Sequence, residues 1–146
     1  MTKHHRTPRL LGTLLLVAAA GLSVVGAAPA PAGRTATPLD RVIPAPASVD
    51  PGGSPYKITR GTHIRVDDSR EARGVGEYLA DVLRPSTGYR LPVTTNGSGG
   101  IRLRLADGQF GAEGYRLDSG AQGVTITAHK PAGLFHGVQT LRQLLP

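Results

Sequence analysis

The chain has 146 residues, of which 39% are hydrophobic and 18% charged, and it contains no cysteine. The absence of cysteine excludes a disulfide framework and a lipid-modified cysteine anchor, and it argues against the small disulfide-stabilised inhibitors common among secreted proteins. The net charge of +7 is concentrated near the start: after residue 34, 13 basic side chains face 10 acidic ones, so we expect no nucleic-acid partner.

The first 32 residues have the layout of a secretory signal peptide. Lys3, Arg6 and Arg9 make the start basic, an apolar run covers residues 10–25, and small residues follow. This order predicts a signal peptide over residues 1–32 and a secreted, extracellular product. The run is shorter than the roughly 20 residues of a membrane span, so we expect no stable membrane anchor.

Residues 33–55 are rich in proline, alanine, glycine and serine and include Ile-Pro-Ala-Pro at 43–46. Because proline fixes φ and blocks helix, we predict an extended lead-in there. The remaining residues, 56–146, are enough for one domain.

Apolar and polar residues alternate in several short segments of this domain, as expected for half-buried strands. A turn is predicted over residues 118–123, between the last two of these strand segments. Strands with one apolar face and one solvent-exposed face are typical of a largely antiparallel sheet that is covered on one side. The strand segments are 64–66, 91–93, 101–105, 115–117 and 124–128.

Two helices complete the predicted α+β fold, in which both pack on one face of the largely antiparallel sheet. The first covers about residues 69–84, with Asp68 as its cap, Glu71 completing a capping box, and Pro85 and Gly88 ending it. The second covers about residues 131–145, with Pro131 in its first turn.

Both helices have an apolar or small-residue arc of roughly 200°, whereas a surface helix needs only about 100°. We therefore expect each helix to be buried on two sides, by its own sheet and by a partner outside this chain. The side chains expected to face water without that partner are Val75, Val82, Phe135 and Leu144.

Few residues suggest chemistry. Asp67 and Asp68 are adjacent, and neighbouring strand residues point to opposite faces, so we interpret the pair as a helix cap. The histidines at 63, 129 and 136 are too scattered for a metal site. Gly133 and Gly137 predict close packing of helix on sheet. We expect no catalytic, substrate-binding, cofactor-binding or metal-binding residue, and no cofactor.

Four arginines could share the wet face of the sheet, at positions 65, 102, 104 and 116. A solvated face is the simpler interpretation, and a polyanion site is the alternative.

Four segments carry a family resemblance: Val-Ile-Pro-Ala-Pro at 42–46, Glu-Gly-Tyr-Arg-Leu at 113–117, Gly-Val-Thr-Ile-Thr-Ala at 123–128, and the glycine-punctuated helix at 133–145. Together they resemble the N-terminal non-catalytic domain of secreted bacterial β-N-acetylhexosaminidases of glycoside hydrolase family 20.

The resemblance implies that the two helices lie between the sheet and a following (β/α)8 barrel, which is the expected partner. Such enzymes remove terminal β-linked N-acetylhexosamine, as in chitin degradation, by substrate-assisted retaining hydrolysis. Their catalytic carboxylates and their amino-sugar site belong to the barrel, so this chain alone is predicted inactive. The alternatives are a stand-alone secreted carbohydrate-binding module and a secreted partner-binding or inhibitor protein.

Overall fold

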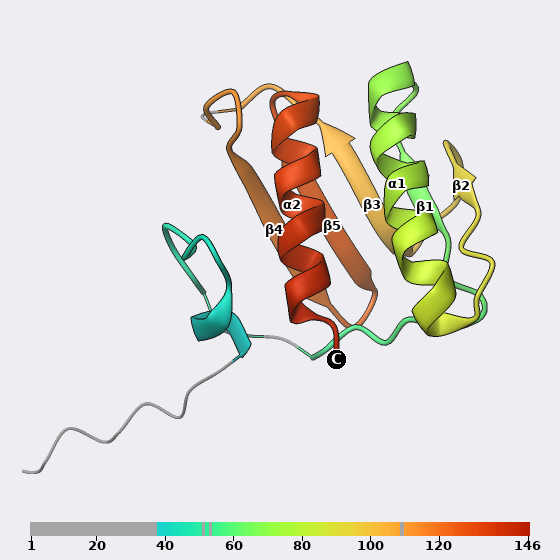
Figure 1. Cartoon of the computed structure of the whole chain (residues 1–146). Helices are drawn as coiled ribbons and strands as arrows, with labels where there is room; N and C mark the ends of the chain where they lie inside the picture. Colours follow the sequence, from blue (N-terminus) through green and yellow to red (C-terminus); the bar gives the residue numbers. More distant parts are fainter. Residues whose placement is uncertain (1–37, 51, 53, 109) are drawn as a thin grey trace, which may run out of the picture. The chain divides into compact units, whose positions relative to one another are not determined.

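The computed structural model describes residues 38–50, 52, 54–108 and 110–146. The predicted signal peptide, residues 1–32, lies outside them, as does the start of the lead-in. The described chain folds into one five-stranded sheet with two helices (Figure 1). In chain order, the elements are η1 (Pro38–Arg41), β1 (Ile64–Val66), α1 (Arg70–Thr87), β2 (Val93–Thr94), β3 (Gly100–Leu105), β4 (Tyr115–Gly120), β5 (Gly123–Ala128) and α2 (Pro131–Leu144).

The sheet has the strand order β2-β1-β3-β5-β4 and is mostly parallel. Only the β4–β5 hairpin is antiparallel, and the other three neighbouring pairs are parallel. The prediction of a largely antiparallel sheet was therefore wrong. Alternation reports which face of a strand is buried but not the direction of the strand, and helix α1 returns the chain so that β2 runs parallel to β1.

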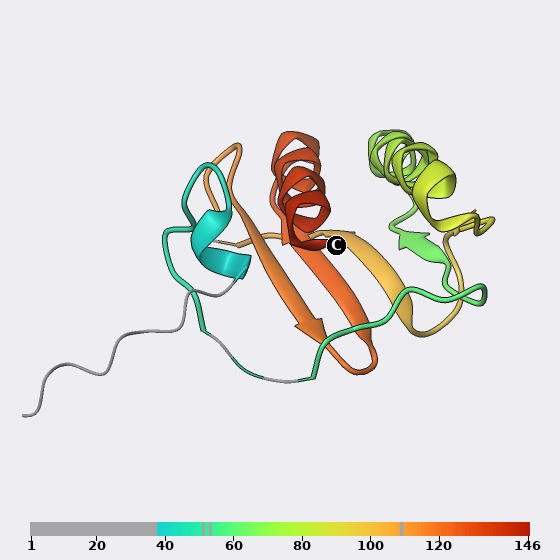
Figure 2. The same ribbon diagram turned by 60° about the horizontal axis from the view of Figure 1, so that its bottom comes forward.

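Both helices cover the same face of the sheet, as predicted, and the described chain leaves the other face open (Figure 2). The covered face is built from rows of apolar side chains in register across the central strands. Ile64, Ile101 and Val124 form one row, and the next row consists of Val66, Leu103 and Ile126. All six are at most 4% exposed and belong to the core.

Helix α1 and its cap each lie one residue later in the chain than predicted. The Ser69 side chain accepts a hydrogen bond from the Ala72 N–H at 3.0 Å, so Ser69 rather than Asp68 is the cap. Asp67 instead accepts the Leu105 N–H with its Oδ2 at 2.7 Å, which joins the ends of β1 and β3. The interpretation of Asp67 and Asp68 as a helix cap was wrong because Ser69 already offers an oxygen at the right offset.

The end of α1 was predicted partly correctly. Gly88 ends the helix with φ 68°, a left-handed conformation that glycine adopts without strain, and its N–H bonds to the Arg84 carbonyl at 2.9 Å. Pro85 does not end the helix but lies inside its last turn. Helix α2 starts at Pro131, as predicted, and ends at Leu144, one residue before the predicted end.

The described part of the lead-in is less extended than predicted, because Pro38 opens the short 3-10 helix η1. Further along, the backbone of Ile43 is bound by α2. The Gln143 side chain accepts the Ile43 N–H and donates to the Ile43 carbonyl, both at 2.9 Å. No helix among the described residues combines the length and apolar character needed to span a membrane.

Candidate docking surface

Helices α1 and α2 touch through an aromatic pair on their solvent side. The rings of Tyr78 and Phe135 have centroids 5.1 Å apart with an interplanar angle of 43°. Gln139 donates from Nε2 to the Tyr78 hydroxyl at 3.0 Å. These contacts were not predicted from the sequence, because the spacing of two helices that are 61 residues apart in the chain follows from how each one packs on the sheet.

Glycines set how closely the helices approach the sheet. A Cβ added at Gly76 would lie 2.6 Å from Cγ1 of Val66, which is shorter than any normal carbon contact. A Cβ at Gly133 would lie 2.9 Å from that of Ala128, and one at Gly137 would overlap Ile126. The prediction that Gly133 and Gly137 serve close packing of helix on sheet is confirmed.

The outer faces of the two helices differ in charge. On α1, Arg84 pairs with Asp81 at 2.7 Å and lies 3.9 Å from Glu77. On α2, Phe135 is 40% exposed, and its ring lies 6.3 Å from that of His136 in an edge-on arrangement. The outer face of α2 thus carries one exposed aromatic ring, with the exposed Arg142 in the last turn of the helix.

The predicted exposure of four apolar side chains is confirmed only for Phe135. Val75, Val82 and Leu144 are half-buried. An exposed aromatic ring with polar neighbours is typical of a surface that packs against another protein surface. Arg142 joins these residues by donating from Nη1 to Gln139 Oε1 at 2.8 Å. We call this surface, made by Tyr78, Phe135, His136, Gln139 and Arg142, the docking surface.

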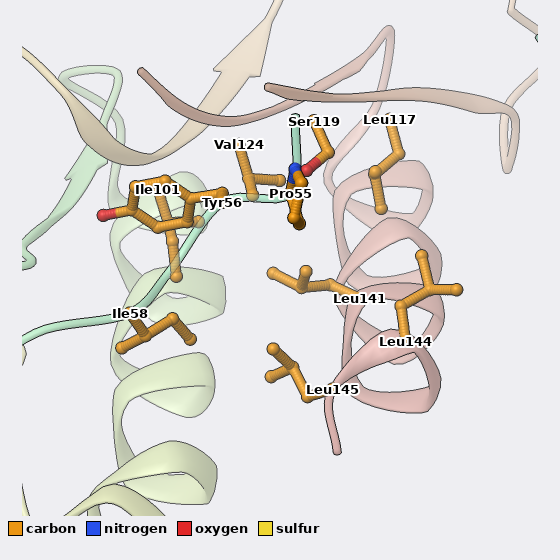
Figure 3. A pocket seen from close by; sticks show the side chains of 10 residues that line it. All are labelled: Pro55, Tyr56, Ile58, Ile101, Leu117, Ser119, Val124, Leu141, Leu144 and Leu145. Carbon is orange, nitrogen blue, oxygen red and sulfur yellow. The ribbon is translucent and has the colours of Figure 1, made fainter. Parts of the chain in front are cut away.

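An apolar pocket of about 130 Å³ lies where the lead-in passes the end of α2 (Figure 3). Among its described lining residues there is no carboxylate, imidazole or amine, and the Tyr56 hydroxyl bonds to Thr62 Oγ1 at 2.9 Å. The pocket therefore offers packing space but no acid or base. Its lining residues are Pro55, Tyr56, Ile58, Ile101, Leu117, Ser119, Val124, Leu141, Leu144 and Leu145.

The three histidines of the domain lie apart from one another. His63 Nδ1 is 3.4 Å from the Gly61 carbonyl, His129 Nδ1 is 3.6 Å from Asp107 Oδ1, and His136 lies on α2 beside Phe135. Among the described residues, no three His, Asp or Glu side chains gather as metal ligands would.

The register of the sheet brings the four arginines onto one face, as predicted. Arg65 pairs with Arg102 across β1 and β3. Thr127 of β5 pairs with Arg104 on one side and with Arg116 on the other. These side chains alternate with the buried rows, so all four project from the face that no helix covers.

Residues 40–146 match the family described as "Glycosyl hydrolase family 20, domain 2". Over 112 residues, the chain is 32% identical to a protein of Porphyromonas gingivalis named "Beta-hexosaminidase", and the match covers 72% of this chain and 14% of that protein.

Solved structures resemble the fold closely. The GH20 beta-N-acetylhexosaminidase from Streptomyces coelicolor A3(2) is 84% identical with a TM-score of 0.74. The N-acetyl-beta-hexosaminidase of Streptomyces plicatus, solved in complex with Thio-NAglucal, is 84% identical with a TM-score of 0.73. Each match covers 75% of this chain but only 22% of the Streptomyces protein.

Proposed function

The chain belongs to glycosyl hydrolase family 20, as domain 2 of that family, and from this we propose that it is the non-catalytic scaffold domain of a β-N-acetylhexosaminidase. The observation that carries the proposal is its 84% identity, over 75% of the chain, to two Streptomyces enzymes with that activity in their names. The reaction would be removal of terminal β-linked N-acetylhexosamine, including from chitin fragments.

In this proposal, catalysis belongs to a (β/α)8 barrel that this chain does not supply. The barrel would hold the amino sugar, whose acetamido oxygen attacks the anomeric carbon while barrel carboxylates orient it and transfer the proton. Two observations fit a supporting role for the present domain: the described lining of the pocket beside α2 offers no acid or base, and the docking surface exposes the aromatic ring of Phe135.

The docking surface is the proposed contact with the barrel, with the exposed ring of Phe135 as its main apolar group. Burying that ring would remove apolar area from water at about 25 cal/mol per Å². The Gln139 bond to Tyr78 would hold both helices in the spacing that the barrel meets.

Export is part of the proposal, with residues 1–32 as the signal peptide. N-terminal sequencing of protein recovered from the culture medium tests it. We expect a new N-terminus between residues 28 and 33, and an intact Met1 on a membrane-bound product would contradict export.

The decisive experiment compares the 146-residue chain with a longer protein that carries a family 20 barrel after it. We expect hydrolysis of an aryl N-acetyl-β-glucosaminide only from the longer protein. Turnover by the purified 146-residue chain, persisting after contaminating enzymes are removed, would refute the scaffold role. Binding of neutral chitin oligomers by the chain alone would favour the carbohydrate-binding module instead.

The contact with the barrel is tested by Phe135→Ser, with Arg73→Ser on the exposed side of α1 as the control. In the longer protein, we expect Phe135→Ser to lower Tm and the control to leave it unchanged. In the 146-residue chain, the same substitution should reduce the binding of a hydrophobic dye, because the ring is then free. Equal Tm values for both variants in the longer protein would contradict the contact.

A further inference from the structure

The open face of the sheet concentrates positive charge at its centre. Arg65 and Arg102 are direct partners on parallel neighbouring strands, about 4.8 Å apart. Arg104 follows on the same face of β3, two residues and roughly 6.6 Å further along the strand. We call these three side chains the arginine cluster.

The acids of this face do not neutralise the cluster. Asp118 pairs with Arg116, whose Nε lies 2.9 and 3.0 Å from its two oxygens. Asp67 uses Oδ2 to accept the Leu105 N–H. Across the described ranges, no carboxylate oxygen lies within 4.0 Å of a nitrogen of the cluster.

The positive charges of the arginine cluster are therefore uncompensated, and one of its nitrogens lacks a hydrogen-bond partner among the described residues. Like charges on directly paired strand residues repel each other, and Arg65 and Arg102 are such a pair. Arg65 donates to the Gly97 carbonyl, which satisfies one nitrogen without neutralising the charge. The Arg102 Nε is shielded from solvent and has no hydrogen-bond partner in the described part of the chain. A bound anion would relieve the repulsion.

The same face indicates which kind of anion fits. A guanidinium matches the planar carboxylate group, and the Arg116–Asp118 pair shows a carboxylate already held on this surface. The four tyrosines pack against the core, Phe135 lies on α2, and the half-buried Phe110 lies between β3 and β4, so none of these rings projects from a strand of the open face. Stacking is what single-stranded nucleic acid requires.

Hydroxyl groups flank the arginine cluster on β2 and β5. Thr94 pairs with Arg65, Thr125 with Arg102, and Thr127 with Arg104. All three threonines are half-buried, and their alternation places them on the open face. Hydroxyls beside guanidinium groups can bond sugar hydroxyls and ring oxygens while the arginines bind the acid groups.

We propose that the open face binds a linear polysaccharide with carboxylate groups, laid across β1, β3 and β5, through Arg65, Arg102 and Arg104. The site is separate from the docking surface, because it lies on the opposite side of the sheet (Figure 2). It would attach the protein to acidic glycans while the helix side remains free for its partner.

The test measures binding of hexagalacturonate to the 146-residue chain by calorimetry at about 50 mM NaCl, where screening is weak. The variant carries Arg65→Gln, Arg102→Gln and Arg104→Gln together. The matched control carries Arg70→Gln, Arg73→Gln and Arg90→Gln, three exposed arginines elsewhere, and so has the same net charge. We expect at least about tenfold weaker binding for the cluster variant, less than about twofold for the control, and weaker binding of all proteins at about 200 mM NaCl.

Several results would overturn the proposal. The first is that the unsubstituted chain does not bind hexagalacturonate at millimolar concentration. The second is that both triple variants lose the same affinity, and the third is that the uncharged methyl ester binds as tightly as hexagalacturonate. Tighter binding of single-stranded DNA than of hexagalacturonate would assign the face to nucleic acid instead.

Circular dichroism reports whether each variant folds. If the cluster variant does not fold, the single Arg104→Gln substitution replaces it, because Arg104 is exposed, and we then expect about threefold weaker binding. Loss of less than a factor of about 1.5 would count against the site. No glycosidase activity is measured, so failure here leaves the scaffold proposal unaffected.

Discussion

Helices α1 and α2 lie side by side on the same sheet face, yet α1 carries its own start and stop signals and α2 largely lacks them. Helix α1 has a serine cap, an acid in its first turn and a left-handed glycine at its end. Helix α2 begins after Lys130, which makes no side-chain cap bond, has no acid in its first turn and ends in extended backbone at Leu145.

The difference shows that the two helices are stabilised from different sources. Local signals stabilise α1, since capping and the pairing of Arg84 with Asp81 need no other element. Each helix contains two glycines, which weaken an isolated helix, but only α2 lacks a side-chain cap bond as well, and both of its glycines, Gly133 and Gly137, are buried against the sheet. Its helical form therefore depends on packing.

The largest test of this comparison is Gly137→Val. The new side chain would overlap Ile126 and crowd Tyr115, so we expect the free energy of unfolding to fall by about 3 kcal/mol. Chemical denaturation measures the change. A loss below about 1 kcal/mol would mean that α2 can shift away from the sheet at little cost, and that the glycine is not needed for packing.

The second test removes the local start signal of α1. Ser69→Ala deletes the acceptor of the Ala72 N–H, and we expect a loss of about 1 kcal/mol in the free energy of unfolding. Ser69→Asp, which keeps a capping oxygen, serves as the control and should change stability much less. Equal losses for both variants would show that the cap bond contributes nothing.

The third test uses a glycine in α1 that has no packing role. A Cβ at Gly74 meets nothing within 4 Å, so Gly74→Ala should stabilise the protein by about 0.8 kcal/mol through helix propensity alone. Thermal denaturation should show a higher Tm. A lower Tm would contradict the view that only the glycines facing the sheet are required.

The smallest effect is expected from adding a capping side chain at the start of α2. Lys130 has the extended backbone of a cap residue, with φ −127° and ψ 157°. Lys130→Ser would supply an oxygen for the first turn and remove a positive charge from the helix N-terminus, adding about 0.5 kcal/mol. Lys130→Ala is the control that removes the charge only. Equal free energies of unfolding for the serine and alanine variants would mean that a capping side chain does not stabilise the first turn of α2.

The positions of the strands and helices were more predictable from the sequence than the contacts between them. Alternation identified the segments that became β1, β3, β4 and β5, and Pro131 and Gly88 marked helix boundaries correctly. Two predictions about the ends of α1 were wrong. Asp68 was predicted as the N-cap, but the side chain of Ser69 caps the helix, and Pro85 was predicted to end the helix but lies within its last turn. Both outcomes depend on the local backbone geometry, which the sequence pattern does not specify.

Of the two surfaces, the open face was anticipated better than the docking surface. Four arginines at alternating positions predicted a shared wet face, because alternation alone fixes which way a strand side chain points. The pairing of Arg65 with Arg102 depends on register. The Tyr78–Phe135 contact likewise depends on where α1 and α2 lie on the sheet.

The sequence by itself determined the two helices, four of the five strands, the inward face of those strands, and the family to which the domain belongs, because these follow from local periodicity and motif. Only the tertiary structure decided that β1, β2, β3 and β5 run parallel, that Asp67 joins β1 to β3, and that three arginines meet without a nearby acid. Strand direction and register depend on pairing between distant segments. A period of two residues reads the same in either direction along the chain and so cannot encode them.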